Sequence, residues 1–268
     1  LYLGKINNFS QLGSDDRPLA LLVREGKISG VGYSLRKHLF EDQVAAIFDV
    51  NEMPDLSPPR VKDLVERLIE DYTREGHPYN PDWYGYTILF LSEYVMATDD
   101  QSVMPGLRRL ALEAANGQSI VGSWGHRFAG PDGRLVGYGM MNAPGLPLTT
   151  SLVMARMAGV TDPALDQAID RSAKLLRFYI GKGAVPYGDH HPWIQTHEDN
   201  GKCGMAAVMF NLLDEAEGVE FFSRMSVASH GAERDTGHTG NFFNMLWSLP
   251  GVAQSGPLAL ELHFPAAD

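Results

Sequence analysis

The sequence predicts an all-α fold in which repeated helical hairpins form a complete or partial α/α toroid. Two observations lead to this prediction. Segments that are apolar nearly all round alternate with amphipathic segments. A short motif, in which a polar residue stands two or three places before a glycine, opens the apolar segments. A helix that is apolar all round is buried and an amphipathic one faces water, so the alternation predicts inner helices wrapped by outer ones.

The N-terminal region is set apart from the helical domain by a proline-rich stretch. Residues 1–59 form a segment to which no fold is assigned, and the toroid domain is predicted over residues 60–268. Within the first segment, Leu19–Val23 is predicted as a short buried strand or part of a helix, and residues 34–48 are a helical candidate. Pro54, Pro58 and Pro59 place the boundary, since proline interrupts helices.

Helical periodicity continues along the rest of the chain. Nearly all-apolar helices are predicted at residues 82–97, 145–158, 201–213 and 237–249, and amphipathic ones at residues 61–75, 102–115, 162–180 and 217–227. Asp162 is a predicted N-cap with Pro163 in the first turn, and Gly181 and Gly183 end that helix. The glycine-rich residues 116–142 are irregular, with a hairpin expected around Pro131–Gly133, and the tail after Pro250 is also expected to be irregular.

An internal repeat supports the hairpin prediction. Residues 199–210 align with residues 235–246, residues 142–153 resemble both, and residues 82–85 are a weaker copy. The polar residue is expected to cap the helix, and the glycine to let neighbouring backbones approach at the crowded inner layer. Stacked copies would bring the helix N-termini, and the loops before them, to one mouth.

Composition excludes several classes of partner. The formal charge of −11 argues against non-specific binding to nucleic acid or to an anionic membrane, both of which need basic patches. The single cysteine excludes an internal disulfide framework. The chain begins at Leu1, so we expect a processed or trimmed part of a longer precursor that could be exported, and localisation stays open.

The stretch Val185–Cys203 holds three of the nine histidines, three carboxylates and the only cysteine. By the repeat, its loop and the loop at residues 228–236 precede neighbouring inner helices and should face each other, with Arg127 of the glycine-rich loop nearby. The acid–base candidates are His190, His197, Glu198, Asp199, His230, Glu233 and Asp235. The candidates for substrate binding are Trp83, Tyr84, Trp124, His126, Tyr187, Trp193 and Arg234.

Three kinds of chemistry fit these residues. Carboxylates and histidines beside aromatic walls suit a sugar, cleaved by hydrolysis or by elimination across a uronic acid. Asp199, Cys203 and His238 could instead hold zinc, which takes these ligand types. Cys203, beside Lys202 at a predicted helix N-terminus, could be a nucleophile. The structural alternative is that Asp199 and Asp235 only cap helices and Cys203 only packs.

Four segments resemble an uncharacterised bacterial family whose members can carry a PDZ-like domain. They are residues 139–145, 180–190, 197–207 and 226–243, and the resemblance covers about residues 79–256. It implies an α/α toroid like that of terpenoid cyclases and protein prenyltransferases, without an established activity. Prenyltransferase β subunits hold zinc through an Asp, a nearby Cys and a distant His, and Asp199, Cys203 and His238 occur in that order.

The sequence therefore leaves three functions open. The first is a carbohydrate-active enzyme that uses histidine and carboxylate acid–base catalysis. The second is a zinc-dependent transferase or cyclase, and the third is a non-catalytic module that binds a glycan, a peptide or a small molecule. Nucleic acid and membrane are not expected as partners.

Overall fold

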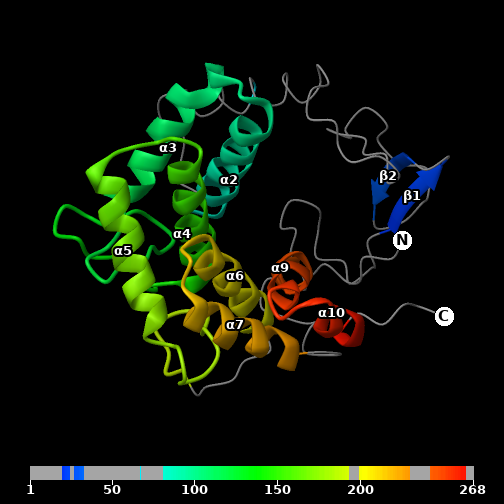
Figure 1. Ribbon diagram of the computed structural model, residues 1–268. Helices are drawn as coiled ribbons and strands as arrows, with labels where there is room; N and C mark the ends of the chain where they lie inside the picture. The colour runs from blue at the N-terminus through cyan, green and yellow to red at the C-terminus, as the bar shows by residue number, and fades with distance from the viewer. Residues whose placement is uncertain are drawn as a thin grey trace.

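The computed structural model describes residues 20–24, 27–32, 67, 81–192, 199–229 and 242–263. Over residues 81–263 the described part is all-α, which confirms the predicted class (Figure 1). Its α-helices are α2 (Pro81–Thr98), α3 (Met104–Asn116), α4 (Asn142–Met157), α5 (Pro163–Arg177), α6 (Asp199–Leu212), α7 (Ala216–Ala228), α9 (Phe242–Ala253) and α10 (Pro257–His263). A 3-10 turn, η2 (Gln101–Val103), precedes α3.

A separate β-hairpin lies near the N-terminus. Strand β1 (Ala20–Arg24) pairs antiparallel with β2 (Lys27–Gly32), and the register shifts between Leu22 and Val23. Of the two alternatives for Leu19–Val23, the strand is therefore confirmed. The helices predicted at residues 34–48 and 61–75 lie outside the described residues, except that Arg67 is helical.

Apolar and amphipathic helices alternate along the described chain, although two leucines of the apolar α9, Leu246 and Leu249, are exposed. The apolar helices pack on one another in chain order, α2 against α4, α4 against α6, and α6 against α9. The amphipathic α3, α5 and α7 cover this row, as Figure 1 shows. Among these helices a hydrogen bond also crosses the row, because the indole Nε1 of Trp247 in α9 donates to the Tyr86 hydroxyl of α2 at 3.1 Å. The described helices do not show a toroidal arrangement.

Two hydrophobic clusters meet at α4. One joins α2 to α5 and includes Leu91, Leu107 and Leu152, all fully buried. The other joins α6, α7 and α9, where Phe210 stacks on Phe222 with ring centroids 5.5 Å apart and an angle of 4° between the planes. No described helix is apolar enough over a sufficient length to cross a lipid bilayer.

Glycines allow close contact within the buried row, as the repeat predicts. A Cβ added at Gly85 of α2 would stand 2.8 Å from the Cβ of Pro147 in α4. One added at Gly204 of α6 would stand 2.3 Å from the carbonyl oxygen of Trp247 in α9. Real Cβ atoms are not found at such distances from backbone atoms, so glycine is required at Gly204.

The helix ends follow the sequence in part. The Asp162 carboxylate accepts from the Ala164 N–H at 3.0 Å, and Pro163 occupies the first turn, so this cap is confirmed. Asn142 does not cap α4, because it is the first residue of the helix and the N-cap position is taken by Met141, which makes no side-chain capping hydrogen bond. Residues 130–134 form a tight turn without strands, and α10 is a helix where an irregular tail was expected.

Candidate functional site

The segment of residues 185–192 is fixed to the N-terminal end of α4. The Asn142 side-chain amide donates to the Pro186 carbonyl at 2.9 Å and lies 3.5 Å from the Tyr179 hydroxyl. The Asn142 backbone N–H donates to the Tyr187 carbonyl at 2.7 Å. Asn142 is 1% exposed. Since a buried amide without partners is costly, these contacts explain why Asn142 serves as a bridge between segments rather than as a cap.

Met141 brings two loops that are distant in sequence to the same place. It forms β-bridges with Trp124 on one side and with Gly188 on the other. The Met141 N–H donates to the Trp124 carbonyl at 2.9 Å. The loop that follows Trp124 and the segment that follows Gly188 therefore flank the end of the glycine-rich stretch. The glycine-rich loop, which was expected near the histidine-rich stretch, is thus joined to residues 185–192 through Met141.

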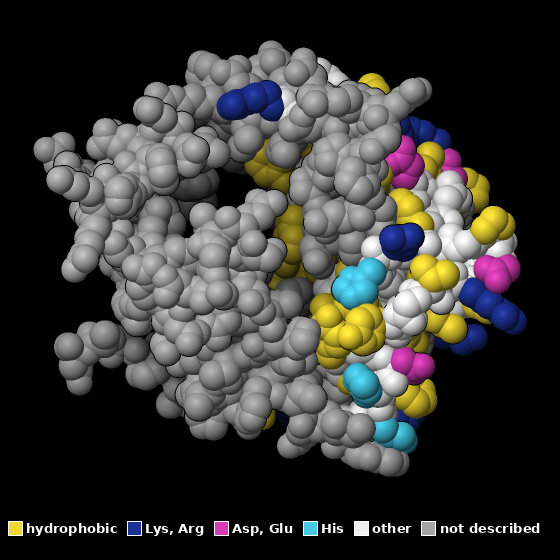
Figure 2. Space-filling model, turned by 180° about the vertical axis from the view of Figure 1, so that it is seen from behind, with side chains coloured by type: hydrophobic (Ala, Val, Ile, Leu, Met, Phe, Trp, Pro, Cys, Tyr) yellow, Lys and Arg dark blue, Asp and Glu magenta, His cyan; other side chains and the backbone are white. Residues whose placement is uncertain are grey.

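Three of the predicted site residues on these segments are exposed or half-buried. His190 and His126 are exposed, and Tyr187 is half-buried. The neighbouring Asp189 and His191 are exposed as well. Figure 2 shows histidine side chains gathered on one face of the molecule, with hydrophobic side chains between them. This face therefore presents groups that can donate, accept or transfer protons.

Two further candidates from the aromatic set have structural contacts. Trp124 is fully buried, and its indole N–H donates to the Ala114 carbonyl at 2.8 Å. The Tyr84 hydroxyl donates to the Glu113 carboxylate at 2.7 Å, and the Tyr84 ring meets Phe128 edge-on with centroids 5.3 Å apart. These contacts hold α2, α3 and the glycine-rich loop together, and a ligand role for either ring stays a prediction.

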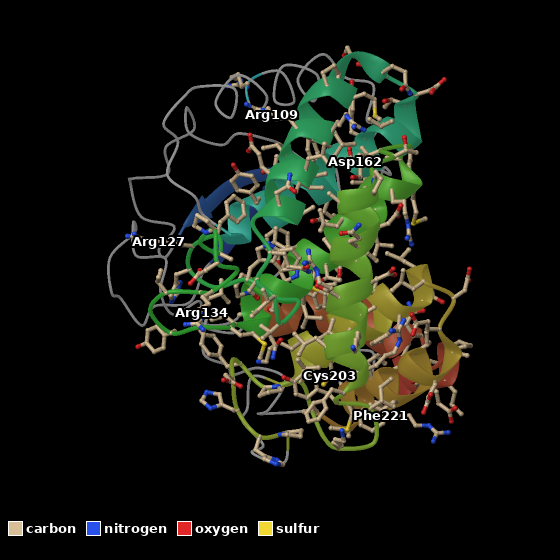
Figure 3. The ribbon with its side chains drawn as sticks, turned by 90° about the vertical axis from the view of Figure 1, so that its left-hand side faces the viewer. Arg109, Arg127, Arg134, Asp162, Cys203 and Phe221 are labelled. Atoms are coloured by element: carbon tan, nitrogen blue, oxygen red, sulfur yellow. The ribbon has the colours of Figure 1, made fainter. Side chains whose placement is uncertain are left out.

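Cys203 lies inside the helical body, as Figure 3 shows. It is 1% exposed and belongs to the cluster around α6. The adjacent Lys202 is 3% exposed. Among the residues that the structure describes, no three histidine, cysteine or carboxylate side chains are grouped as metal ligands would be. The side chain of Asp199 and the whole of His238 lie outside that description, so the zinc trio stays a prediction.

The other predicted residues also lie outside the described side chains. They are Trp83, Trp193, His197, Glu198, His230, Glu233, Arg234 and Asp235. Of the two loops predicted to face each other, the structure describes only residues 185–192 and 228–229, and residues 185–192 lie at the N-terminal end of α4. The part of the predicted mouth that would come from residues 230–241 is not tested.

Tyr179 is a buried titratable residue that the sequence did not single out. Its ring is 3% exposed and its hydroxyl lies at the Asn142 amide. Burial raises the pKa of Tyr179, the hydrogen bond from Asn142 lowers it, and the negative charge of Asp189 raises it again. The phenol therefore stays protonated at neutral pH. The sequence marked only its partner, Asn142, and predicted a helix-capping role for that residue instead of a contact with Tyr179.

A separate groove lies at the C-terminal end of α6. It has a volume of about 710 Å³ and lies between α7 and the turn from α9 to α10. Its walls include Glu215 and Glu220, but each of these is already in an ion pair, with Arg177 and Arg224 respectively. The groove is thus separate from the loops that precede α4 and α6.

The chain belongs to the family DUF6288. The model of this family, described as a domain of unknown function, matches residues 46–267. No curated protein and no solved structure gives a significant match. The family match confirms the resemblance to an uncharacterised family, and it extends further toward the N-terminus than the segments that carried the resemblance.

Proposed function

We propose that this protein is a carbohydrate-active enzyme whose acid–base residues stand on the loops before α6 and α9. The observation that carries the proposal is the anchoring of residues 185–192 by Asn142 and Met141. It holds a segment rich in titratable side chains on a helical scaffold, while Asp189, His190 and His191 remain exposed. Catalytic groups need such fixed positions, and loops on rigid scaffolds commonly supply them.

Both cleavage reactions are compatible with these residue types. In hydrolysis, one carboxylic acid protonates the leaving oxygen and a second carboxylate activates water or attacks the sugar. In elimination from a uronic acid, a base removes the C5 proton, the bond from C4 to the glycosidic oxygen breaks, and that oxygen takes up a proton. A C4–C5 double bond forms and no water is consumed. Histidine is suited to the proton transfers because its charge changes near neutral pH.

The experiment is an assay of the purified protein on neutral and acidic polysaccharides with two readouts. New reducing ends report either reaction, and ultraviolet absorbance of the new double bond reports elimination alone. We expect cleavage of at least one polysaccharide. The His190→Gln and Glu198→Gln variants should then lose about a hundredfold or more in rate, as removal of a general acid or base does.

His77→Gln is the matched control, because the sequence leaves His77 outside the cluster. It should keep the full rate. If both site variants keep the wild-type rate on a cleaved polysaccharide, the acid–base assignment is wrong. If no polysaccharide is cleaved but one is bound, the chain is a glycan-binding module instead.

A further inference from the structure

The loop before α4 carries an aromatic side chain that is almost fully exposed. Tyr138 is 83% exposed, and its ring meets His126 edge-on, with centroids 5.7 Å apart and an angle of 70° between the planes. Gly137 and Gly139 flank it with φ angles of 76° and 77°, which favour glycine. A Cβ at either glycine would meet no atom within 4 Å, so backbone conformation rather than packing requires them. The loop thus holds a tyrosine out of the core.

Two arginines extend the same surface. Arg127 follows His126 directly and is exposed. Arg134 is 80% exposed and has the Asp132 carboxylate 3.9 Å away, a loose and solvated pair. Figure 3 shows Arg127 and Arg134 on the loops at one side of the molecule, away from the buried Cys203. Both guanidinium groups are therefore available to an incoming anion.

The charge of this loop contrasts with that of the whole chain. Residues 117–141 contain two arginines and one aspartate, a net charge of +1, whereas the chain as a whole carries −11. The neighbouring residues 181–192 add Lys182 and Asp189, which cancel. An acidic polymer would therefore meet less repulsion at this loop than the charge of the whole chain indicates.

We propose that this surface, formed by His126, Arg127, Arg134 and Tyr138, binds an acidic polysaccharide whose sugars carry carboxylates. This inference rests on the proposed function and names its substrate class. Tyr138 offers an apolar ring for the flat face of a sugar, and its edge contact with His126 fixes the orientation of the ring. The arginines supply the planar donors that match a carboxylate. A neutral sugar would use the ring but not the guanidinium groups.

The position of the surface fits this substrate. Its loop joins the segment that bears Asp189 and His190 through the bridges that Met141 makes with Trp124 and Gly188. A polymer bound at Tyr138 would thus lie on a loop that the Met141 bridges connect to the segment with the exposed histidines. With a carboxyl group attached to C5, elimination becomes the favoured one of the two reactions, because a carboxylate whose charge is neutralised by a positive partner makes the C5 proton acidic.

The test is affinity electrophoresis of the whole chain in gels that contain polygalacturonate or alginate, with methyl-esterified polygalacturonate as the uncharged counterpart. We expect retardation by at least one of the acidic polymers and none by the ester. Arg127→Gln with Arg134→Gln should weaken that binding about tenfold or more, because charge-assisted hydrogen bonds are lost. Tyr138→Ala should weaken binding to the acidic polymer as well.

Arg224→Gln is the control. Arg224 is 75% exposed, but it lies on α7 rather than on the loop, and it is paired with Glu220 of the same helix. It should bind as the wild type does. Equal retardation by acid and ester, retardation by neither acidic polymer, or full binding by the arginine variants would each overturn the inference. Binding without cleavage would overturn only the proposed function, and cleavage of a neutral polysaccharide alone would overturn only this inference.

Discussion

The Trp247 indole donates a hydrogen bond to the Tyr86 hydroxyl at 3.1 Å, across 161 residues of sequence. It joins the first and the last of the four apolar helices in the described chain, α2 and α9. Trp247 is 8% exposed, so its N–H has little water to replace a lost partner. The hydrogen bond therefore helps to hold the ends of the buried row together.

Tyr86→Phe should destabilise the protein by about 1–3 kcal/mol, because it leaves the indole N–H without its acceptor. Urea unfolding measures this loss. Tyr138→Phe is the matched control, since that tyrosine is 83% exposed and its change should stay within about 0.5 kcal/mol. Equal stability of the two variants would show that the hydrogen bond contributes nothing.

Gly204→Ala should cost about 1–3 kcal/mol or more, because its Cβ would stand 2.3 Å from the Trp247 carbonyl oxygen and α6 and α9 would have to separate. Gly251→Ala tests the same contact from the other helix, since its Cβ would stand 2.2 Å from the Gly204 Cα. Asp170→Ala on the exposed face of α5 is the control. If the melting temperature falls no further for Gly204→Ala than for Asp170→Ala, the close contact between α6 and α9 is contradicted.

The buried and amphipathic helices could be predicted because each leaves a local record in the sequence. Because α4 and α6 are apolar nearly all round, their burial can be predicted without knowing which helix packs against them. The repeated glycines marked where helices approach. Helix α10 was missed because it has only seven residues and follows Pro250, after which no helical pattern was expected. Its signal was the pair Gly256–Pro257, where glycine at φ 94° precedes a first-turn proline.

The contacts of the site could not be predicted in the same way. Asn142 has the residue type and the position of a cap, yet its amide contacts Pro186, 44 residues away. Trp124 lies in a glycine-rich stretch that reads as surface, yet packing against α3 buries it completely. Such choices depend on which segment arrives from elsewhere in the chain, and no local pattern records that.

Asn142→Ala should free the segment of residues 185–192 as well as destabilise the fold. Loss of the hydrogen bond to the Pro186 carbonyl should cost about 1–3 kcal/mol. Hydrogen exchange measured by mass spectrometry should be faster in residues 185–192 of the variant than in the same residues of the wild type. Exchange in α5 should change less. Asn116→Ala, at the exposed end of α3, is the control. Unchanged exchange in the segment would mean that Asn142 does not anchor it.

Tyr84 should make the protein less stable in alkali. Burial raises its pKa, and the hydrogen bond to the Glu113 carboxylate raises it further. Above a pH of about 10 the unfolded chain loses this proton while the folded protein keeps it, so unfolding becomes more favourable as pH rises. Tyr84→Phe removes this contribution. Urea midpoints measured at increasing pH should therefore fall less steeply in the variant, and parallel curves would refute the explanation.

Cys203 should react with a thiol reagent only when the protein opens. Its side chain is 1% exposed, and a buried thiol without access to solvent is inert. Because Cys203 is the only cysteine, the wild-type chain reports on it without background substitutions. The rate of labelling in native conditions should be far below that of the urea-unfolded chain and should rise with added urea. A native rate near the unfolded one would contradict the buried placement and would favour the interpretation of Cys203 as a nucleophile.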